Sequence, residues 1–375
     1  MRVAIIHPWF PQYRKEFFQH LRTRAAARGI EVDIYHGAAP PELRARNDTA
    51  DSQMAMELPT RYFRIGSRSF GLKSLKPLRR AAKYDLVILE QAVRNLETYT
   101  FLLRSIASHV AFWGHGRTYT KEVGRIQEHL KMWLTFRGEW FFAYTRGGAE
   151  HVVAAGYPEE SVTIVNNSID TAGLRDMVTS LDDDDVVAFR NRFQLTEPVG
   201  LFIGGLDFSK RLDFLVEACQ EVWSSVPEFH LLVVGDGPDA QFMREITAAE
   251  PRVRHVGSLF GREKAIAMKA SQLLVMPGRV GLVAVDSFAA GLPIVTTDWP
   301  WHAPEFEYLE DGVNARITEN SVTAYASTVT DLLLDGTART ELVQGCRSSS
   351  AKYTTELMAA RFVEGLISFR ATVGD

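Results

Sequence analysis

Residues 271–314 constrain the fold of this chain more than any other stretch of its sequence. Two short apolar runs, residues 273–276 and 294–297, have the composition of strands buried in a parallel sheet. Between them, residues 277–281 must turn, and residues 283–290 carry apolar or small side chains on nearly every side, as a buried helix does. Two strands joined by one helix form a right-handed crossover, so this stretch predicts an α/β fold.

The end of the expected helix and the turn before it indicate where a ligand binds. Gly291 and Pro293 end the helix, because glycine suits the position after a helix and proline cannot extend one. Ligands of open α/β sheets bind beyond the carboxyl ends of the strands. Gly278, Arg279 and Gly281 occupy that place, followed by the free N–H groups of the helix, and such groups favour an anionic ligand.

Residues 277–314 also resemble the donor-binding signature of family 4 glycosyltransferases of the GT-B type. Spacing, glycines and acids agree over about forty residues, which makes the match specific. The positions in register are Gly281, Leu282, Val283, Asp286, residues 289–293, Glu307 and residues 311–314. The family's first acid falls on Gly278, and its second acid is Asp286 instead of a glutamate.

The resemblance implies two Rossmann-like domains that face each other across a cleft. Residues 1–175 would form an N-terminal acceptor-binding domain, and residues 176–355 a C-terminal domain that binds the nucleotide sugar. Residues 356–375 would form a terminal helix that crosses back to the first domain. A chain of 375 residues is long enough for two such domains, each with its own core.

Composition narrows the class of protein and its compartment. With 46% apolar and 23% charged residues, the chain is neither disordered nor fibrous. It has only two cysteines, Cys219 and Cys346, so we expect no disulfide framework and a reducing, cytoplasmic location. No apolar run approaches the roughly 20 residues of a spanning helix, and the N-terminal segment is too short for a secretory signal.

Charge is distributed unevenly along the chain. Residues 1–175 hold 25 Lys and Arg against 17 Asp and Glu, a net of +8, and the remainder is net −12. The most basic part, residues 61–83, contains no acid. Its cations are Arg61, Arg64, Arg68, Lys73, Lys76, Arg79, Arg80 and Lys83. They are either a solvated loop and helix face, or a patch for anionic lipid headgroups or a lipid-diphosphate acceptor at the inner face of the cell membrane. Nucleic acid is not expected, because no nucleic-acid-binding motif is present.

The first half of the sequence alternates predicted strands and helices. The strands are residues 2–7, 31–35, 85–90 and 110–113, separated by helical patterns and by a polar segment, residues 37–60, that we expect to be an exposed loop. Pro11, Tyr13 and Arg14 follow the first strand and are candidate acceptor-binding residues, together with Arg117. Residues 128–142 are rich in aromatic side chains, and their apolar positions form no single stripe. We therefore expect a helix packed in the core, and a monotopic membrane contact is the less favoured alternative.

His115 is the candidate catalytic residue of the first half. It stands in a Gly-His-Gly-Arg turn directly after the strand at residues 110–113, where a side chain is placed to meet a substrate. The alternative is a turn histidine that bonds only to its own loop. The related family has a histidine in the corresponding loop near the donor sugar, so the resemblance implies the catalytic role.

The second half contains a further candidate loop for a diphosphate. Residues 204–211 join a strand to a helix and carry glycines, a serine, Lys210 and Arg211, a combination that suits a diphosphate. Lys210 matches a family lysine that reaches the diphosphate, whereas Gly205 occupies the position of the family's arginine, for which Arg211 can substitute. The alternative is that both cations are solvated. The turn with Gly235 and Asp236 resembles one that lines the family's nucleotide pocket.

These residues suggest a mechanism. Lys210, Arg211 and the N–H groups near Gly281 would stabilise the negative charge on a departing nucleoside diphosphate, which is usually the largest catalytic contribution. Asp286 would bind the ribose hydroxyls; alternatively, it is a buried acid paired with a structural cation. Glu305 or Glu307 would bind the sugar. The resemblance implies retention of anomeric configuration, with no metal and no cofactor other than the donor. We interpret the four acids at 182–185 as a helix start or linker, not a metal site.

The function expected from the sequence is transfer of a sugar from a UDP- or GDP-linked donor to a glycan, a lipid-linked acceptor or a small molecule. Two alternatives stay open, a sugar-nucleotide epimerase of the same architecture and a non-catalytic sugar or lipid binder. Labelled nucleotide sugars distinguish them, because transfer needs an acceptor, epimerisation does not, and a binder does neither.

Overall fold

The computed structural model describes residues 1–40, 54–66, 68–80, 83–103, 107–119, 122 and 124–374. The chain forms two compact units. Met1–Ile169 and Thr355–Asp375 make up the N-terminal unit, and Asp170–Thr354 makes up the C-terminal unit. Both are α/β units built on parallel sheets, so the fold class expected from the sequence is confirmed.

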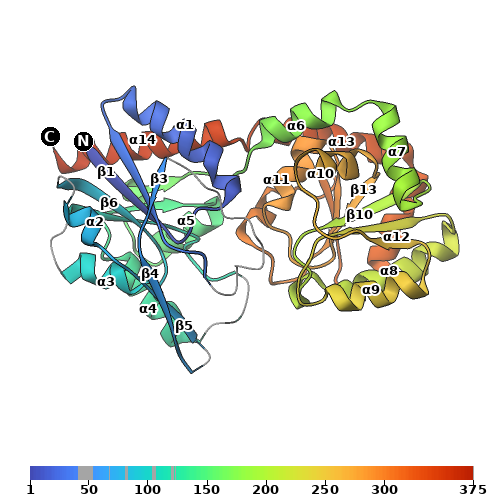
Figure 1. Cartoon of the computed structure of the whole chain (residues 1–375), viewed down its shortest axis with the longest axis horizontal. Coiled ribbons are helices and arrows are strands. Elements are labelled where there is room, and N and C mark those ends of the chain that lie inside the picture. Colours follow the sequence, from blue (N-terminus) through green and yellow to red (C-terminus); the bar gives the residue numbers. More distant parts are fainter. Residues whose placement is uncertain are drawn as a thin grey trace. The chain divides into compact units, whose positions relative to one another are not determined.

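The N-terminal unit is organised around a seven-stranded sheet in the order β3-β2-β1-β6-β7-β8-β9, with parallel pairing throughout (Figure 1). Its strands are β1 (Arg2–His7), β2 (Glu31–His36), β3 (Ala55–Glu57), β6 (Tyr84–Glu90), β7 (Ala107–Gly114), β8 (Trp140–Ala143) and β9 (Val162–Ile164). The strand order reverses between β1 and β6, and the loops that follow these strands therefore border the crevice where ligands of such sheets bind.

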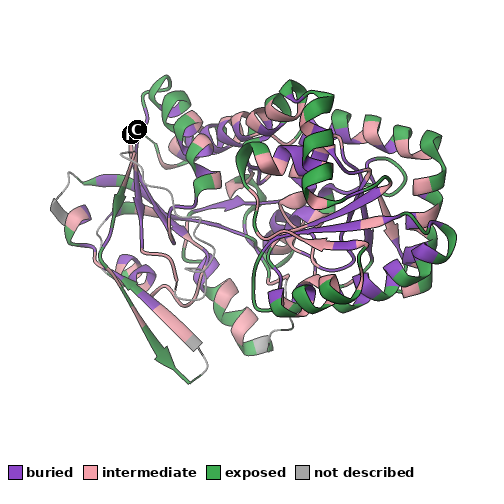
Figure 2. Ribbon diagram, turned by 45° about the vertical axis from the view of Figure 1, so that its right-hand side comes forward, coloured by how far each residue is buried: buried purple, intermediate pink, exposed green. Residues whose placement is uncertain are grey.

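Helices cover both faces of this sheet. They are α1 (Lys15–Ala26), α2 (Lys76–Arg80), α3 (Leu96–Leu103), α4 (Arg125–Thr135), α5 (Arg146–Ala154) and α14 (Thr355–Val373), with short 3-10 turns η1 (Gln12–Arg14) and η3 (Glu159–Ser161). One core lies between the sheet and α1 with α14, and the other lies on the opposite face beneath α3, α4 and α5. Figure 2 shows the central strands of the sheet largely buried and the outward faces of the helices exposed.

The C-terminal helix α14 belongs to the N-terminal unit, as expected. Its Phe362 stacks on Phe142 of β8 with ring centroids 4.1 Å apart, and it also contacts Phe17 of α1 and Trp113 of β7. Because these rings are buried on one face of the sheet, α14 completes a core that the first 169 residues leave uncovered.

Two expectations for the N-terminal unit were wrong. The segment 37–60, expected to be an exposed loop, contains strand β3 and the start of β4 (Thr60–Ile65), and its residues 41–53 lie outside the described part of the chain. The basic stretch 61–83 is largely an antiparallel hairpin of β4 and β5 (Arg68–Lys73). One of its cations, Lys73, is buried and pairs with Glu97 at 2.7 Å, so it is not part of a solvated patch.

The C-terminal unit has a six-stranded parallel sheet in the order β12-β11-β10-β13-β14-β15. Its strands are β10 (Val199–Ile203), β11 (His230–Val234), β12 (Val253–His255), β13 (Leu273–Val275), β14 (Ile294–Thr297) and β15 (Ala315–Thr318). In chain order this is the 3-2-1-4-5-6 arrangement of a dinucleotide-binding fold, and its strand order reverses between β10 and β13.

The helices of this unit are α6 (Thr171–Ser180), α7 (Asp183–Phe193), α8 (Leu212–Ser225), α9 (Ala240–Ala249), α10 (Gly261–Lys269), α11 (Val283–Ala290), α12 (Val322–Leu334) and α13 (Gly336–Ser350). Short 3-10 turns are η4 (Phe208–Lys210) and η5 (Pro304–Tyr308). The β13-α11-β14 crossover follows the sequence prediction closely. Gly291 ends α11 in the left-handed conformation, at φ 65°, as its position after the helix requires.

None of the helices in the described part of the chain combines the length and the apolar content that a bilayer crossing requires.

Candidate functional site

The loops that follow β10 and β13 pack directly against each other at the switch point of the C-terminal sheet. The N–H of Arg279 donates to the carbonyl oxygen of Ser209 at 2.8 Å. The Nζ of Lys210 donates to the carbonyl oxygen of Arg279 at 2.6 Å. Lys210 is therefore held at the loop that begins with Gly278, and the two segments predicted to bind the donor are brought together.

Gly278 stands where the related family has its first acid, and the structure explains why no side chain is present there. A Cβ at this position would lie 2.5 Å from the carbonyl oxygen of Ser209 and 2.6 Å from the carbonyl carbon of Lys210. Both atoms belong to the backbone and cannot rotate away. The contact between the two loops thus requires glycine at 278.

Gly205, at the position of the family's arginine, is in a different environment. It is exposed, and a Cβ there would meet only one carboxylate oxygen of Asp207, at 3.8 Å. The position has room for a long side chain. Local packing therefore does not explain why glycine replaces the family's arginine here.

The turn with Gly235 and Asp236 lies against the same loop. The N–H of Leu206 donates to the carbonyl oxygen of Asp236 at 2.9 Å. Gly235 has a φ of 149°, and a Cβ on it would lie 1.8 Å from the carbonyl oxygen of Gly204. The Asp236 side chain is exposed and accepts from the N–H of Gly237 at 2.8 Å. The structure therefore places the Gly235–Asp236 turn next to the loop that carries Lys210.

Arg211 adopts the left-handed conformation, at φ 55°, between η4 and α8. This conformation is costly for a residue other than glycine. Its guanidinium lies over the ring of Phe214 at 4.1 Å and 6.0 Å from the ring centroid of Trp299, and it donates to the side-chain oxygen of Asn320. Lys210 and Arg211 therefore diverge: Lys210 reaches the loop after β13, and Arg211 reaches the loops after β14 and β15.

The N-terminus of α11 supplies unpaired backbone donors. Within the described part of the chain, the N–H groups of Gly281, Leu282 and Val283 have no recorded acceptor, and no side chain caps the helix. All three residues are half-buried, so their N–H groups lie near the surface. Such a helix end is an anion-binding site by its N–H groups and its dipole.

Glu305 and Glu307 differ sharply in their environments. Glu305 is 3% exposed, and its Oε2 lies 3.6 Å from the place that a Cβ on Gly281 would take. Glu307 is exposed. The structure therefore brings Glu305 beside the N-terminus of α11 and leaves Glu307 on the surface.

His302 holds this part of the site together, although the sequence did not single it out. The N–H of Val280 donates to its Nδ1 at 3.0 Å, so its Nε2 carries the hydrogen that is donated to the carbonyl oxygen of Thr297 at 2.9 Å. Burial lowers the pKa of His302 to about 4, and the hydrogen bond that Nδ1 accepts from Val280 requires the neutral ring. The histidine thus ties the loop after β13 to the end of β14.

Asp286 forms an ion pair with Lys264 of α10, with Lys264 Nζ 2.7 Å from Asp286 Oδ1. The pair is partly buried, with 13% of the Asp286 side chain exposed. The alternative to a ribose-binding role for Asp286 was a pairing with a structural cation, and Lys264 is such a cation. Only Oδ1 is engaged by Lys264, and a carboxylate can accept further hydrogen bonds through its second oxygen.

In the N-terminal unit, His115 follows β7, as predicted, and its side chain is exposed. Its ring lies on Tyr144, with centroids 4.5 Å apart. Gln91, which follows β6, fixes this turn: its Oε1 accepts from the N–H of Gly116 at 3.0 Å, and its Nε2 donates to the carbonyl oxygen of Gly116 at 3.1 Å. Gln91 is a positioning residue that the sequence did not reveal, because it lies 25 residues from Gly116.

The four candidate acceptor-binding residues do not share one environment. Pro11 and Arg14 are buried, Tyr13 is half-buried, and Arg117 is exposed. The guanidinium of Arg14 lies 5.4 Å from the ring centroid of Tyr144, the same ring that His115 contacts, and donates to the carbonyl oxygen of Ser168 at 3.5 Å. Arg14 thus supports the His115 region from beneath, and Arg117 is the cation of this set that faces solvent.

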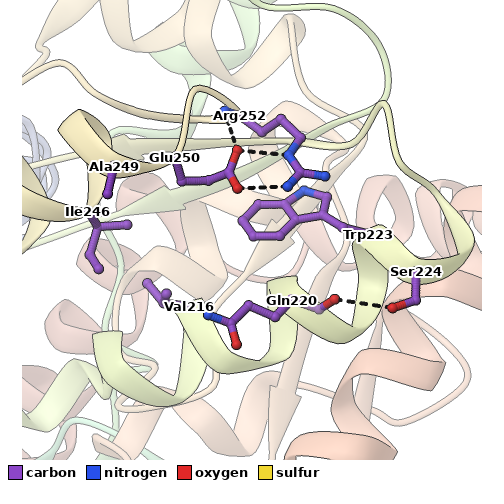
Figure 3. Close-up of a pocket in the computed structure, with 8 residues that line it drawn as sticks. All are labelled: Val216, Gln220, Trp223, Ser224, Ile246, Ala249, Glu250 and Arg252. Atoms are coloured by element: carbon purple, nitrogen blue, oxygen red, sulfur yellow. Dashed lines mark hydrogen bonds and ion pairs between the residues drawn. The ribbon is translucent and has the colours of Figure 1, made fainter.

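A groove of about 500 Å³ lies elsewhere on the C-terminal unit, between α8, α9 and β12 (Figure 3). Arg252 stacks on Trp223 at 4.1 Å and pairs with Glu250 at 2.7 Å. The groove lies near the ends of α8 and α9 and the start of β12, whereas the loops described above follow the ends of the strands. Since its cation is already paired, we do not assign the donor to this groove.

In the described residues, no group of three or more His, Cys, Asp or Glu side chains is arranged to hold a metal ion. The acids at 182–185 form the start of α7, where Asp182 and Asp185 make a reciprocal capping box.

Comparison with known proteins agrees with this architecture. Residues 197–335 match the family described as Glycosyl transferases group 1. A sulfoquinovosyl transferase of Arabidopsis thaliana is 28% identical over 102 residues, which is 26% of this chain and 19% of that protein. A phosphatidyl-myo-inositol mannosyltransferase of Mycobacterium leprae is 24% identical over 169 residues, 44% of each protein. The chain thus spans less than half the length of either curated relative.

Among solved structures, the Anabaena protein HepE in complex with UDP has a TM-score of 0.70 at 15% identity, covering 98% of this chain and all of that one. The resemblance to group 1 glycosyltransferases of the GT-B type is confirmed, in sequence over residues 197–335 and in fold over nearly the whole chain.

Proposed function

We propose that this protein is a glycosyltransferase that moves a sugar from a nucleoside-diphosphate sugar to an acceptor. The observation that carries the proposal is the convergence, at the switch point between β10 and β13, of Lys210 with the unpaired N–H groups at the start of α11. Solved structures of similar fold include a complex with UDP, which makes UDP the first nucleotide to test.

The diphosphate is the part of the donor that this arrangement suits best. As the sugar leaves, negative charge develops on the diphosphate, and fixed donors aimed at that charge lower the barrier. Lys210 donates to the carbonyl oxygen of Arg279, which holds its ammonium group at the loop after β13. The N–H groups of Gly281, Leu282 and Val283 are already in place, so they need little reorganisation.

The remaining parts of the donor are assigned to two acids. We propose that Asp286 accepts hydrogen bonds from the ribose hydroxyls through the oxygen that Lys264 does not engage. We propose that Glu305 binds the sugar, because it lies beside Gly281, whereas Glu307 faces solvent.

The N-terminal unit would provide the acceptor side of the reaction. We propose His115, fixed by Gln91 and Tyr144, as the residue that approaches the donor sugar, and the exposed Arg117 as an acceptor contact. By resemblance to the family, transfer would retain the anomeric configuration and need no metal and no cofactor. The acceptor would be a glycan, a lipid-linked molecule or a small molecule, and a lipid-linked acceptor would place the protein at an anionic membrane surface.

The test is incubation of the purified protein with a panel of labelled UDP- and GDP-sugars, with and without lipid and oligosaccharide acceptors. Acceptor-dependent release of the nucleoside diphosphate supports the proposal. Conversion of the sugar nucleotide without acceptor would indicate an epimerase, and binding without turnover would indicate a non-catalytic binder. Lys210→Gln should lose turnover, whereas Lys15→Gln, an exposed lysine on α1, is the matched control.

A further inference from the structure

Arginines stacked on aromatic rings recur in the C-terminal unit, and one of them has no carboxylate partner. Within the described part of this unit, Arg192, Arg211 and Arg252 each lie over a neighbouring ring, at 4.7, 4.1 and 4.1 Å from its centroid. Arg192 and Arg252 each form an ion pair with a glutamate, at 3.0 and 2.7 Å. Arg211 forms no ion pair with a described residue, so its charge remains available to a ligand.

Arg252 shows which group completes such a stacked guanidinium (Figure 3). Its Nε and Nη2 donate to the two carboxylate oxygens of Glu250, at 2.8 and 2.7 Å, while the guanidinium lies over the ring of Trp223. A carboxylate fits this edge because its two oxygens match the two parallel N–H groups. The same unit thus contains a completed example of a stacked arginine with its carboxylate.

The corresponding edge of Arg211 is open. Its Nη1 donates to the side-chain oxygen of Asn320, whereas Nε and Nη2 have no acceptor among the residues that the structure describes. Neither nitrogen is one of the buried side-chain atoms that lack a partner, so both are accessible to solvent. Asp213 raises the pKa of Arg211 through space, but it is exposed and does not reach the guanidinium. Arg211 therefore offers the two N–H groups that Arg252 uses for Glu250.

The local structure holds this guanidinium in place at a cost to the backbone. Arg211 has a φ of 55°, a conformation that residues other than glycine rarely adopt. The buried ring of Phe214 lies beneath the guanidinium, and Asn320 fixes one of its ends. Backbone strain of this kind is concentrated at ligand sites. A cation fixed in advance also loses little conformational freedom when a ligand binds.

The order of the strands places Arg211 on the sugar side of the proposed donor site. Along the sheet edge the order is β11-β10-β13-β14, and the diphosphate is assigned to the loops after β10 and β13. The turn assigned to the nucleotide follows β11, on one side of the diphosphate. Glu305, assigned to the sugar, follows β14 on the other side, as does Trp299, whose ring centroid lies 6.0 Å from the Arg211 guanidinium. The sugar of a bound donor is therefore the part that extends toward Arg211.

We propose that Arg211 binds the carboxylate of an acidic sugar and thereby selects a uronic acid over a neutral hexose. The two oxygens of the sugar carboxylate meet Nε and Nη2 of Arg211, as those of Glu250 meet Arg252. The order of the strands favours the donor sugar as the source of this carboxylate. The inference rests on the proposed function for that placement, because the position of the sugar follows from the diphosphate site.

The test compares the dissociation constants of UDP-glucose, UDP-glucuronate and UDP-galacturonate, measured by calorimetric titration. The wild type should bind at least one of the two uronates about tenfold more tightly than UDP-glucose, as expected for a bidentate hydrogen bond between charged groups. Arg211→Gln should lose this preference. Arg252→Gln is the matched control, because it removes an arginine stacked at the same 4.1 Å outside the site, and it should keep the preference.

A second variant, Arg211→Gly, separates binding from a structural role. Glycine adopts a φ of 55° without strain, so this variant should melt no lower than Arg211→Gln and should also lack the preference. A preference for uronates that survives in both Arg211 variants overturns the proposal. If both variants also melted well below the wild type, Arg211 would be a structural residue.

Free methyl glucuronide and UDP identify the source of the carboxylate and separate this inference from the proposed function. Binding of methyl glucuronide that depends on Arg211, without a preference among the UDP-sugars, supports the carboxylate site and assigns the carboxylate to the acceptor. A wild type that binds UDP and the three UDP-sugars equally, and does not bind methyl glucuronide, overturns this inference alone. A wild type that binds neither UDP nor any UDP-sugar contradicts the proposed function and this inference with it.

Discussion

Restoring the family's first acid at position 278 should damage the protein, although the same acid is part of the donor signature that the chain resembles. A Cβ on Gly278 would stand 2.5 Å from the carbonyl oxygen of Ser209, and 2.6 and 2.7 Å from the carbonyl carbon and oxygen of Lys210. All three atoms belong to the backbone of the loop that carries Lys210. The loop must therefore move to accept any side chain at 278.

The expected cost is the upper part of the range for overpacking a core, about 3 kcal/mol. Gly278 does not have a positive φ, so the cost is steric and not conformational. For a domain of this size, 1 kcal/mol shifts the melting temperature by about 2–4 °C, and the predicted loss for Gly278→Glu is about 6–12 °C. Moving the loop should also weaken UDP binding, because the contact between Lys210 and Arg279 is displaced.

Thermal melting followed by circular dichroism, with and without UDP, measures both effects. Gly205→Ala is the matched control from the same site, because a Cβ there meets only Asp207, at 3.8 Å. It should melt within about 1 °C of the wild type, as substitutions away from close contacts usually do. If Gly278→Glu had the melting temperature and the UDP affinity of the wild type, the account of the two packed loops would be refuted.

Three further predictions concern Gly205, His302 and Gln91. Gly205→Arg should leave the melting temperature unchanged and raise UDP affinity by about tenfold, the value of one charge-assisted hydrogen bond, as checked by calorimetric titration. The pKa of His302 is about 4 in the folded protein against 6.5 in the unfolded chain. The free energy of unfolding should therefore be highest above pH 6.5 and fall by up to about 3 kcal/mol as the pH drops to 4. His302→Gln should remove most of this pH dependence, as measured by urea titrations at several pH values. Gln91→Ala should lower kcat while UDP affinity stays constant, because it releases the His115 turn and a bond to Thr135, both within the N-terminal unit; an unchanged kcat would remove Gln91 from the positioning role.

The sequence predicted the crossover around α11 because each of its parts is specified locally. Apolar runs on either side of a glycine and a proline allow few alternatives, and the ligand position follows from the topology of parallel sheets. For the same reason, the sequence already predicted that Lys210 and the start of α11 lie at one end of the sheet. Their contact through the carbonyl oxygen of Arg279 is a detail of loop packing that no local pattern contains.

The errors occurred where the hydrophobic period changes within a short distance. Residues 140–142 were assigned to the same helix as α4, but they form strand β8, and Gly138 separates the two by packing against Phe112, where a Cβ would lie 2.6 Å from the ring. Phe63 and Ile65 alternate as the residues of a strand do, but the sequence interpretation weighed only the dense positive charge around them, as a solvated loop and helix face or as an anion-binding patch. Glu305 and Glu307 could not be distinguished from the sequence, because they differ in burial, and burial depends on contacts with residues far away in the sequence.

The central claim is that Lys210 and the N–H groups at the start of α11 bind the diphosphate of the donor. Calorimetric titration of UDP against UMP tests it most directly, because the two ligands differ only in the second phosphate. We predict that the wild type prefers UDP by about tenfold or more and that Lys210→Gln loses most of this preference at an unchanged melting temperature. A folded Lys210→Gln protein that kept the full preference for UDP would contradict the claim.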